Sequence, residues 1–208
     1  MKTIILIQHC QSEHHIKKMI GGATDWNLTE YGQLQANNIG RKICNEFNGN
    51  WIIYSSDLRR AKQTAEIIAG YMSNGQGNII NCRKELREQD FGIATGKSSE
   101  WFNEHRIEMK PNTPMIYHRP IEGAETGKEV YSRVAKFMVE INESKDEQVI
   151  IVGHGGSCQM VAAVWLGISV EILEKAALIG GAGGVSVLTE RFDGAKIIKL
   201  WNNMSYRK

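Results

Sequence analysis

Hydrophobic and polar positions alternate along the chain in blocks that predict strands and helices in turn. Continuous apolar runs at Thr3–Ile7 and Val149–Val152 are typical of short strands covered on both faces. Two further runs, the second of them weaker, predict two more strands, and β-branched residues on both sides of the turn Asp193-Gly194 predict another two. The remaining predicted strands are Trp51–Tyr54, Asn78–Ile80, Val185–Thr189 and Ala195–Trp201.

The segments between these strands carry apolar residues at helical spacing. Thr29, Asp57 and Thr126 are suited to cap the N-termini of three helices, and a fourth helix should follow Gly156. The positions expected to face the sheet are Leu34, Ile39, Ile43 and Phe47; Leu58, Ala61, Ala65, Ile68 and Tyr71; and Val130, Val134, Phe137, Met138 and Ile141. Strands that alternate with helices predict an α/β fold with a mostly parallel sheet.

The composition narrows the class of protein. At 208 residues, with 42% hydrophobic and 23% charged residues, the chain fits one domain, residues 1–208. All three prolines lie in the less regular segment 97–125, which we expect to form an insertion over one edge of the domain, at the active site.

Charge and cysteine spacing suggest the surroundings. A net charge of +2 does not favour nucleic acid or an acidic membrane as partner, and no apolar run approaches the ~20 residues of a membrane span. The start of the chain does not resemble a signal peptide. Four widely spaced cysteines are expected to be reduced thiols, so we expect a cytoplasmic protein, with a homodimer as one allowed assembly.

Polar residues follow two of the predicted strands at once. The first strand runs into Gln8-His9-Cys10-Gln11-Ser12, and Val149–Val152 runs into Gly153-His154-Gly155-Gly156. Ligands of open α/β sheets bind beyond the carboxyl ends of the strands. The two histidines therefore predict a functional site at that edge.

Four chemistries use histidine in this setting. A zinc site would require ligand spacings that His9, Cys10, His14 and His15 do not match. A Cys10–His9 nucleophile pair is disfavoured because neighbours on an extended chain point to opposite faces. A cysteine phosphatase needs an arginine six positions after the cysteine, where this chain has Ile16. A histidine that accepts a phosphoryl group needs cations around the phosphate and a proton donor.

Six motifs in a fixed order resemble those of the histidine phosphatase superfamily, the phosphoglycerate-mutase-like group. The first is strand-Arg-His-Gly-x-Thr/Ser, which appears here as Gln8 to Ser12. The others are Gly-x-x-Asp-x-x-Leu-Thr-x-x-Gly-x-x-Gln-Ala from Gly22 to Ala36, SSDLRRAKQTA, EQDFG from Glu88 to Gly92, Gly123 to Thr126, and His154-Gly-Gly after a strand. The resemblance spans almost the whole chain and implies a three-layer α/β/α sandwich of the phosphoglycerate-mutase type.

The resemblance implies a role for each matching residue. His9 matches the phosphorylated histidine, and Glu88 matches the acid that protonates the leaving alcohol. Arg60 and His154 match the residues that hold the phosphoryl oxygens. Phosphate or substrate contacts are implied for Gln8, Ser12, His15 and Gly155. The implied partner is a small phosphorylated metabolite, and no metal or other cofactor is implied.

Two departures from the family pattern fall beside the nucleophile. The family's first arginine is Gln8 here, and its glycine is Cys10. Glutamine replaces a charge-assisted hydrogen bond worth roughly 1.5–3 kcal/mol by a neutral one worth ~1 kcal/mol. Another cation, such as Arg59 or Lys18, is expected to assist, or the site is weakened.

Three functions follow as hypotheses. The first is a phosphomonoester hydrolase, which we favour because the chain is shorter than typical mutases of this resemblance. The second is a mutase that returns the phosphoryl group to a bound sugar acid. The third is a phosphate-ligand binding protein whose catalysis was weakened with the missing arginine.

Overall fold

A computed structural model describes residues 1–72 and 79–208. Six strands form one sheet in the order β3-β2-β4-β1-β5-β6. Their bounds are Thr3–Gln8 (β1), Ile52–Ser56 (β2), Ile80–Arg83 (β3), Gln148–Gly153 (β4), Val185–Glu190 (β5) and Lys196–Asn203 (β6). Strands β3, β2, β4 and β1 pair in parallel, and β5 pairs antiparallel with both β1 and β6. Five of the six strands therefore point the same way, as the predicted mostly parallel sheet requires.

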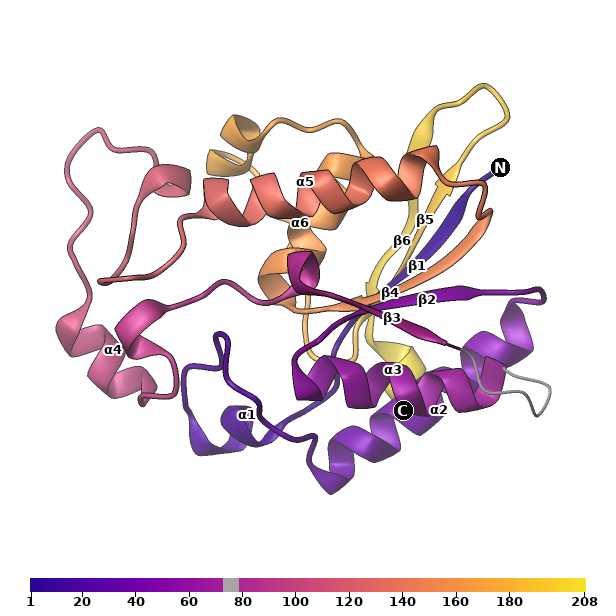
Figure 1. Ribbon diagram of the computed structural model, residues 1–208, viewed down its shortest axis with the longest axis horizontal. Coiled ribbons are helices and arrows are strands. Elements are labelled where there is room, and N and C mark those ends of the chain that lie inside the picture. Colours follow the sequence, from indigo (N-terminus) through magenta and orange to yellow (C-terminus); the bar gives the residue numbers. More distant parts are fainter. Residues whose placement is uncertain (73–78) are drawn as a thin grey trace.

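Helices cover both faces of this sheet, which gives three layers (Figure 1). The helices are Glu13–Lys17 (α1), Glu30–Glu46 (α2), Arg59–Met72 (α3), Ser99–His105 (α4), Gly127–Glu143 (α5) and Gly155–Trp165 (α6). Helices α2 and α3 lie on one face, and α5 and α6 lie on the other. The three-layer α/β/α fold is confirmed.

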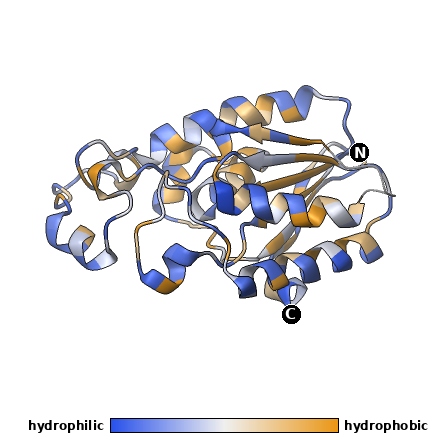
Figure 2. Cartoon of the chain, turned by 60° about the horizontal axis from the view of Figure 1, so that its bottom comes forward, coloured by the Kyte–Doolittle hydropathy of each residue, from blue (hydrophilic) through white to orange (hydrophobic). Residues whose placement is uncertain are grey.

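Alternation along β1 builds two separate cores. Ile4 and Leu6 pack with α5 and α6, whereas Ile5 and Ile7 pack with α2 and α3. Figure 2 shows the consequence, with hydrophobic colour on the inner strands and hydrophilic colour on the outer helix surfaces. Each strand residue therefore has its face fixed by its parity, and this extends to the polar residues that follow β1.

Most predicted elements are present, with four differences. The predicted strand Asn78–Ile80 is displaced: its first residue lies outside the described residues, Ile79 is exposed, and the strand starts at Ile80. Because β3 is an edge strand that pairs only with β2, it does not need a continuous apolar run. Leu34, expected to face the sheet, is 53% exposed.

The other two differences concern helix starts. Asp57 does not precede α3 as its cap, because its carboxylate forms a bidentate pair with Arg87 at 2.7 Å. The N–H of Arg59, the first residue of α3, is instead accepted by Asp25. The fourth predicted helix, expected to follow Gly156, already begins at Gly155.

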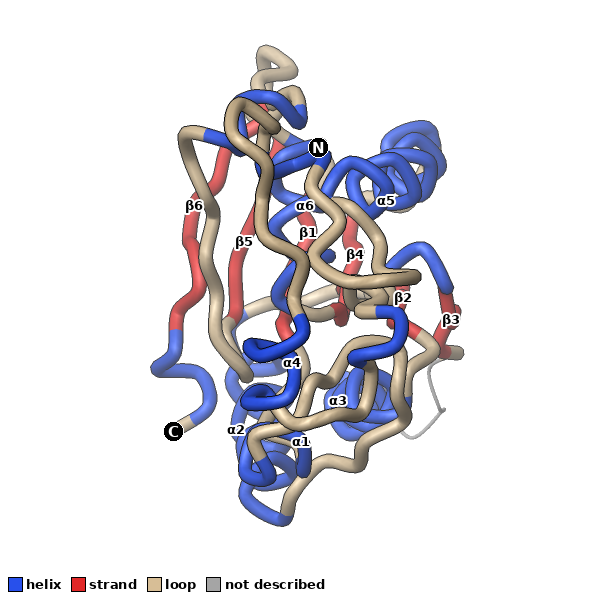
Figure 3. Tube along the Cα trace, turned by 90° about the vertical axis from the view of Figure 1, so that its left-hand side faces the viewer, coloured by secondary structure: helices blue, strands red, loops and turns tan. Residues whose placement is uncertain are grey.

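Thr29 and Thr126 cap α2 and α5 as predicted, through their side-chain oxygens. The segment 97–125 holds the short helix α4 and a turn at Met115–Tyr117. Figure 3 views the sheet from the side on which α4 lies. Within the described ranges, no helix combines the length and apolar character needed to span a bilayer.

Candidate active site

The two histidines follow neighbouring strands and meet at the carboxyl edge of the sheet. Gln8 of β1 pairs with Gly153 of β4, and His9 and His154 are the next residues. The His9 N–H donates to the Gly153 carbonyl at 2.9 Å, so the ends of β1 and β4 are still hydrogen-bonded at this point. The imidazole centroids lie 5.0 Å apart in an edge-to-face arrangement, and both rings are buried.

Hydrogen bonds fix the tautomer of His9. Its Nδ1 lies 2.8 Å from the carbonyl oxygen of Cys10, which can only accept, so Nδ1 carries the proton. Nε2 therefore presents its lone pair, and the Arg60 Nε–H donates to it at 3.2 Å. Burial and the nearby Arg60 charge lower the pKa of His9 well below its usual value. The ring is therefore neutral and nucleophilic at neutral pH.

Arg60 is held beside His9 by the loop before α2. Its Nη1 donates to the Thr24 carbonyl at 2.7 Å, and its Nη2 donates to the Gly22 carbonyl at 2.9 Å. Burial lowers the pKa of Arg60 to about 10, which still leaves the guanidinium charged at neutral pH. Each Nη keeps a second hydrogen. A buried cation with hydrogens to spare is suited to bind an anion.

His154 is fixed from its other side by β2. Its Nε2 lies 2.9 Å from the Ser56 hydroxyl, and its backbone N–H donates to Ser157 Oγ at 2.9 Å. Its Nδ1 is buried without a hydrogen-bond partner among the described residues. Burial, the Arg60 charge and His9 lower the pKa of His154 well below its usual value. The ring that carries this unpaired nitrogen lies beside the His9 ring, and the nitrogen is suited to a polar ligand.

Glu88 approaches the same place from the loop after β3. Its Oε1 accepts the N–H of Gly156 at 3.1 Å and that of Gln89 at 2.9 Å. A Cβ at Gly156 would lie 2.5 Å from this oxygen, so the carboxylate can lie here only because residue 156 is glycine. Burial raises the pKa of Glu88, against the backbone bonds and the Arg60 charge, which lower it. The carboxyl group is therefore more readily protonated than an exposed one.

Arg133 of α5 holds the loop that carries Glu88 through hydrogen bonds to its backbone. Its guanidinium donates to the Glu88 carbonyl at 3.0 Å and to both carboxylate oxygens of Glu125 at 2.9 Å. It also donates to the carbonyls of Glu85 and Arg87. Several charge-assisted bonds on one side chain fix the loop more firmly than a surface ion pair would.

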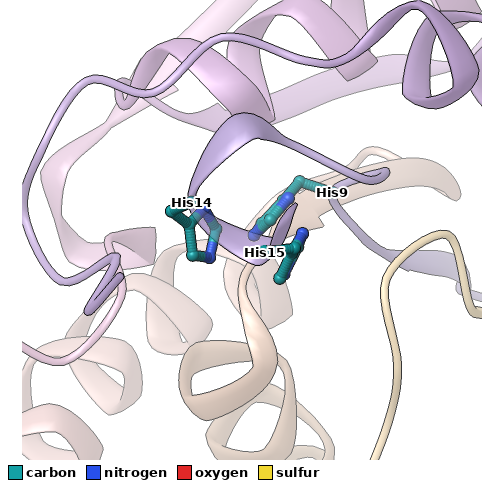
Figure 4. A group of neighbouring side chains, drawn as sticks. All are labelled: His9, His14 and His15. Carbon is teal, nitrogen blue, oxygen red and sulfur yellow. The ribbon is translucent and has the colours of Figure 1, made fainter. Parts of the chain in front are cut away.

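Ser12 organises two further histidines at the start of α1. Its backbone N–H donates to His15 Nδ1 at 3.1 Å, and its hydroxyl lies 2.8 Å from His14 Nδ1. The His15 ring stacks near His9 with centroids 5.4 Å apart, and the His14 ring lies 5.8 Å from His9 (Figure 4). Because His15 Nδ1 accepts, its Nε2 carries the proton when the ring is neutral.

The ring nitrogens of His9, His14 and His15 could in principle hold a metal, since one from each lies within 4.8 Å of the others. Their hydrogen bonds fit a cation poorly. The His9 lone pair already accepts from the positively charged Arg60, and His15 Nδ1 already accepts from Ser12. A divalent ion bound to these nitrogens would replace at least one of these two hydrogen bonds. It would also lie beside the positively charged guanidinium of Arg60, which would repel it. An anion suits this cluster better on charge.

Gln8 does not lie with these residues. Consistent with its parity on β1, its side chain turns to the α6 face, where a Cβ at Gly155 would be 3.6 Å from Gln8 Nε2. A Cβ at Gly180 would lie 3.1 Å from Gln8 Oε1, and this oxygen is buried without a hydrogen-bond partner among the described residues. It borders a cavity of about 10 Å³ next to Asn202. The structure therefore gives Gln8 no direct bond to His9 or Arg60.

The proposed compensating cations are also placed elsewhere. Arg59 is exposed and reaches Asn27, and the exposed Lys18 ends α1 in a left-handed conformation. Cys10 is fully buried, its N–H donates to Thr64 at 3.2 Å, and burial raises the pKa of its thiol to about 12. A buried thiol with a raised pKa is a poor nucleophile. All four cysteines are free.

Sequence reasoning missed four contributors to this site. Ser56 holds His154, Arg133 and Glu125 hold the Glu88 loop, and His14 contacts Ser12. Glu125 and Ser56 lie inside motifs that were quoted without a role for them, so a signal existed for both. His14 was considered only as a metal ligand, although its closeness to Ser12 in the sequence was a signal. Arg133 carries no such signal, because only the folded chain brings it to the Glu88 loop.

Comparison with known proteins gives the family. The model of the histidine phosphatase superfamily (branch 1) matches residues 4–204. A protein of Hydrogenobacter thermophilus named "Putative phosphoserine phosphatase 2" is 31% identical over 175 residues, with 83% of each chain covered. A 2,3-bisphosphoglycerate-dependent phosphoglycerate mutase of Methylorubrum extorquens is 27% identical over 189 residues, with 86% of each covered.

Solved structures share the fold at lower identity. Bacillus stearothermophilus YhfR superposes with a TM-score of 0.81 at 22% identity over the full length of both chains. The phosphoserine phosphatase of Entamoeba histolytica, solved with 3-phosphoglyceric acid, gives a TM-score of 0.78 at 23% identity, again over both full lengths. With a family model that matches nearly the whole chain and a site built around two buried histidines, the protein belongs to branch 1 of the histidine phosphatase superfamily.

Proposed function

We propose that this enzyme is a metal-independent phosphomonoester hydrolase that acts through a phosphohistidine on a small phosphorylated metabolite. The observation that carries the proposal is the state of His9. Its Nδ1 proton is held by the Cys10 carbonyl, so the lone pair of Nε2 lies next to the Arg60 guanidinium and the His154 ring. A neutral nucleophile beside a buried cation is what attack on a phosphate dianion requires.

In the first step, His9 Nε2 attacks phosphorus and the bond from phosphorus to the alcohol oxygen breaks. Glu88, whose pKa is raised by burial, gives its proton to the departing alkoxide. In the second step, the Glu88 carboxylate takes a proton from water, the water oxygen bonds to phosphorus, and the P–N bond breaks. Inorganic phosphate leaves, and His9 Nε2 regains its lone pair, while the Nδ1–H still donates to the Cys10 carbonyl.

The remaining residues hold the substrate. Arg60 and His154 bind the phosphoryl oxygens, with Ser12 and Gly155 as further contacts of the phosphate. His15 offers its Nε2–H to the substrate. Gln8 offers its amide N–H groups to the phosphate from the α6 side, where its Nε2 lies near Gly155. Charge compensation then comes from the protein, without a metal. The unit of function is one domain, residues 1–208, in the cytoplasm, and the segment 97–125 limits access to the site.

The second candidate is phosphoryl transfer of the mutase type, since several relatives are named as phosphoglycerate mutases. A mutase keeps the phosphoryl group on the enzyme until a second sugar acid accepts it. The relatives named as mutases are about as long as this chain, since the alignment covers 86% of each, so the expectation from chain length does not hold against them. The hydrolase is preferred because water needs no additional binding site.

A panel of phosphorylated metabolites, assayed for phosphate release with and without EDTA, tests the proposal. A hydrolase releases phosphate without a primer and is unaffected by EDTA. Dependence on a bisphosphorylated primer with little net phosphate would establish the mutase instead. Phosphate binding without any turnover, persisting in Gln8→Arg, would establish a binding protein.

A further inference from the structure

A hollow of about 410 Å³ lies beside the first turn of α6. Its wall is largely apolar and comes from segment 97–125, from α6 and from the chain after α6. The main apolar side chains are Met115, Ile116, Pro120, Met160, Leu173 and Ile179. Hollows of this size with an apolar wall and a few polar groups are typical of small-molecule sites.

This hollow adjoins the carboxyl group of Glu88. Gly156 and Gln89 both line it, and these two residues donate their backbone N–H groups to Glu88 Oε1. The proposed mechanism has Glu88 protonate the oxygen of the leaving alcohol, so the alcohol must extend from a point next to this carboxyl group. The hollow is therefore placed to receive the body of that alcohol.

The charge of the wall limits what can bind. None of the described residues that line the hollow is a lysine or arginine. Its one carboxylate, Glu174, accepts the backbone N–H groups of Met115 and Ile116. A substrate carboxylate or second phosphate would enter a largely apolar wall next to this negative charge, and no lysine or arginine among the described lining residues would balance it.

Large apolar side chains stand open at the rim. Met115 is 69% exposed and Ile179 is 75% exposed. A second hollow of about 440 Å³ shares Met115, His118 and Pro120 with the first. Its other apolar residues are Phe102, Ile107 and Met109, and the charged residues Arg106 and Glu108 also line it. An extended concave apolar surface next to a catalytic acid favours an elongated apolar ligand.

We propose that the alcohol part of the substrate is a bulky, uncharged and largely apolar group that binds between the turn Met115–Tyr117 and α6. This inference rests on the proposed hydrolase function and assigns its substrate class: phosphomonoesters of apolar alcohols, in place of phosphorylated sugar acids or amino acids. The phosphoryl group stays with His9, and the hollow supplies affinity that grows with the apolar area buried.

The test is a series of primary alkyl phosphates: ethyl, butyl and hexyl phosphate. Their leaving alkoxides have nearly the same basicity, so only the buried chain length differs. Each buried methylene contributes about 0.8 kcal/mol, which predicts a rise in kcat/KM of roughly fourfold per methylene while the chain remains in the hollow. 3-Phosphoglycerate should be a poorer substrate than hexyl phosphate.

Rim variants locate the effect. Met115→Ser and Ile179→Ser should lower kcat/KM for hexyl phosphate several-fold and leave ethyl phosphate unchanged. Both side chains are exposed, so neither change threatens folding. Ile172→Ser is the matched control, since Ile172 is 51% exposed and does not line the hollow. A flat dependence on chain length, or a preference for 3-phosphoglycerate, would overturn the inference.

Binding of ethyl- and hexylphosphonate, which cannot be hydrolysed at their P–C bond, separates the two proposals. If no monoester is turned over, the hydrolase proposal fails, but tighter calorimetric binding of hexylphosphonate would still support the hollow as an apolar site. If ethyl and hexyl phosphate are turned over with equal efficiency and both phosphonates bind equally, the hydrolase stands and the apolar substrate class is wrong.

Discussion

Arg133 of α5 donates a hydrogen bond to the backbone carbonyl of Glu88 at 3.0 Å. The same guanidinium holds the Glu125 carboxylate, so a helix far along the chain sets the position of the proposed acid. The pairing joins the second half of the sequence to the loop after β3. If Glu88 is the acid, Arg133 is a positioning residue for it.

Arg133→Met is therefore expected to lower kcat by roughly ten- to 100-fold, since a displaced acid transfers its proton poorly. Removing a cation that lowers the pKa of Glu88 should also move the basic limb of the pH–rate profile to higher pH. Arg83→Met is the control, because Arg83 forms an exposed pair with Glu140. An unchanged pH limb with only a lower Tm would leave Arg133 a purely structural role.

His9→Ala should abolish turnover. A quenched reaction of the native enzyme should carry acid-labile phosphate on His9, detectable by mass spectrometry under alkaline conditions. The raised pKa keeps the Cys10 thiol protonated, so Cys10 is not the expected site of phosphorylation. Cys10→Ser should therefore still carry the label on His9. Phosphate found on Cys10, or near-native activity in His9→Ala, contradicts the mechanism.

The loss of kcat in Glu88→Gln should depend on how basic the leaving group of the substrate is. Alkyl phosphates need protonation of a basic alkoxide and should lose roughly 100- to 10,000-fold in kcat, whereas p-nitrophenyl phosphate should lose far less. The native profile should rise with pH as His9, whose pKa is lowered, loses its proton. It should fall as Glu88, whose pKa is raised, loses its own. Only the second limb should vanish in Glu88→Gln; equal losses on both substrates would remove Glu88 from this role.

Gln8→Arg is expected to raise kcat/KM and to tighten inhibition by phosphate. A charge-assisted bond in place of a neutral one corresponds to a gain of ~1–3 kcal/mol, or roughly five- to 150-fold. Gln8 Oε1 lies close to Gly180, so whether the longer arginine side chain fits in this space decides whether activity rises or falls. Steady-state kinetics of the single variant and of Gln8→Arg with Cys10→Gly measure the coupling. Lower activity rescued by the second change would show one joint adaptation.

Acid should destabilise the folded state. His9 and His154 have lowered pKa values when folded, so the unfolded chain binds more protons once the pH falls below about 6.5. Glu88, whose pKa is raised, acts in the opposite direction. The net loss between pH 6.5 and 5.5 should be roughly 1–3 kcal/mol, measurable by denaturant unfolding at both values. A variant His105→Ala, at an exposed ring outside the site, should lose as much as the native protein; a flat stability across this range would contradict the buried neutral histidines.

The sequence was informative wherever structure depends on near neighbours. The run Thr3–Ile7, the threonine caps at positions 29 and 126 and the two histidines after strands all lie where local pattern predicts them. It failed where a distant partner decides. Asp57 has the chemistry of a cap, but Arg87, 30 residues away, takes its carboxylate. β3 lies at the edge of the sheet, so it does not need a continuous apolar sequence, and only the order of the strands shows this.

The site followed the same division. Motif order predicted His9, Arg60, Glu88 and His154, which the fold brings to one edge of the sheet. The direction of the Gln8 side chain depends on which helix covers each face of β1, and no motif contains that information.

The bond from His9 Nδ1 to the Cys10 carbonyl has a consequence for how this protein can change. The acceptor belongs to the main chain, so every residue type at position 10 offers it alike. Replacement of the family's glycine by cysteine therefore leaves the ring orientation intact, and mutation at this position can alter packing without touching the nucleophile. The orientation of the reactive nitrogen is inherited with the path of the backbone, and it outlasts changes in the side chains around it.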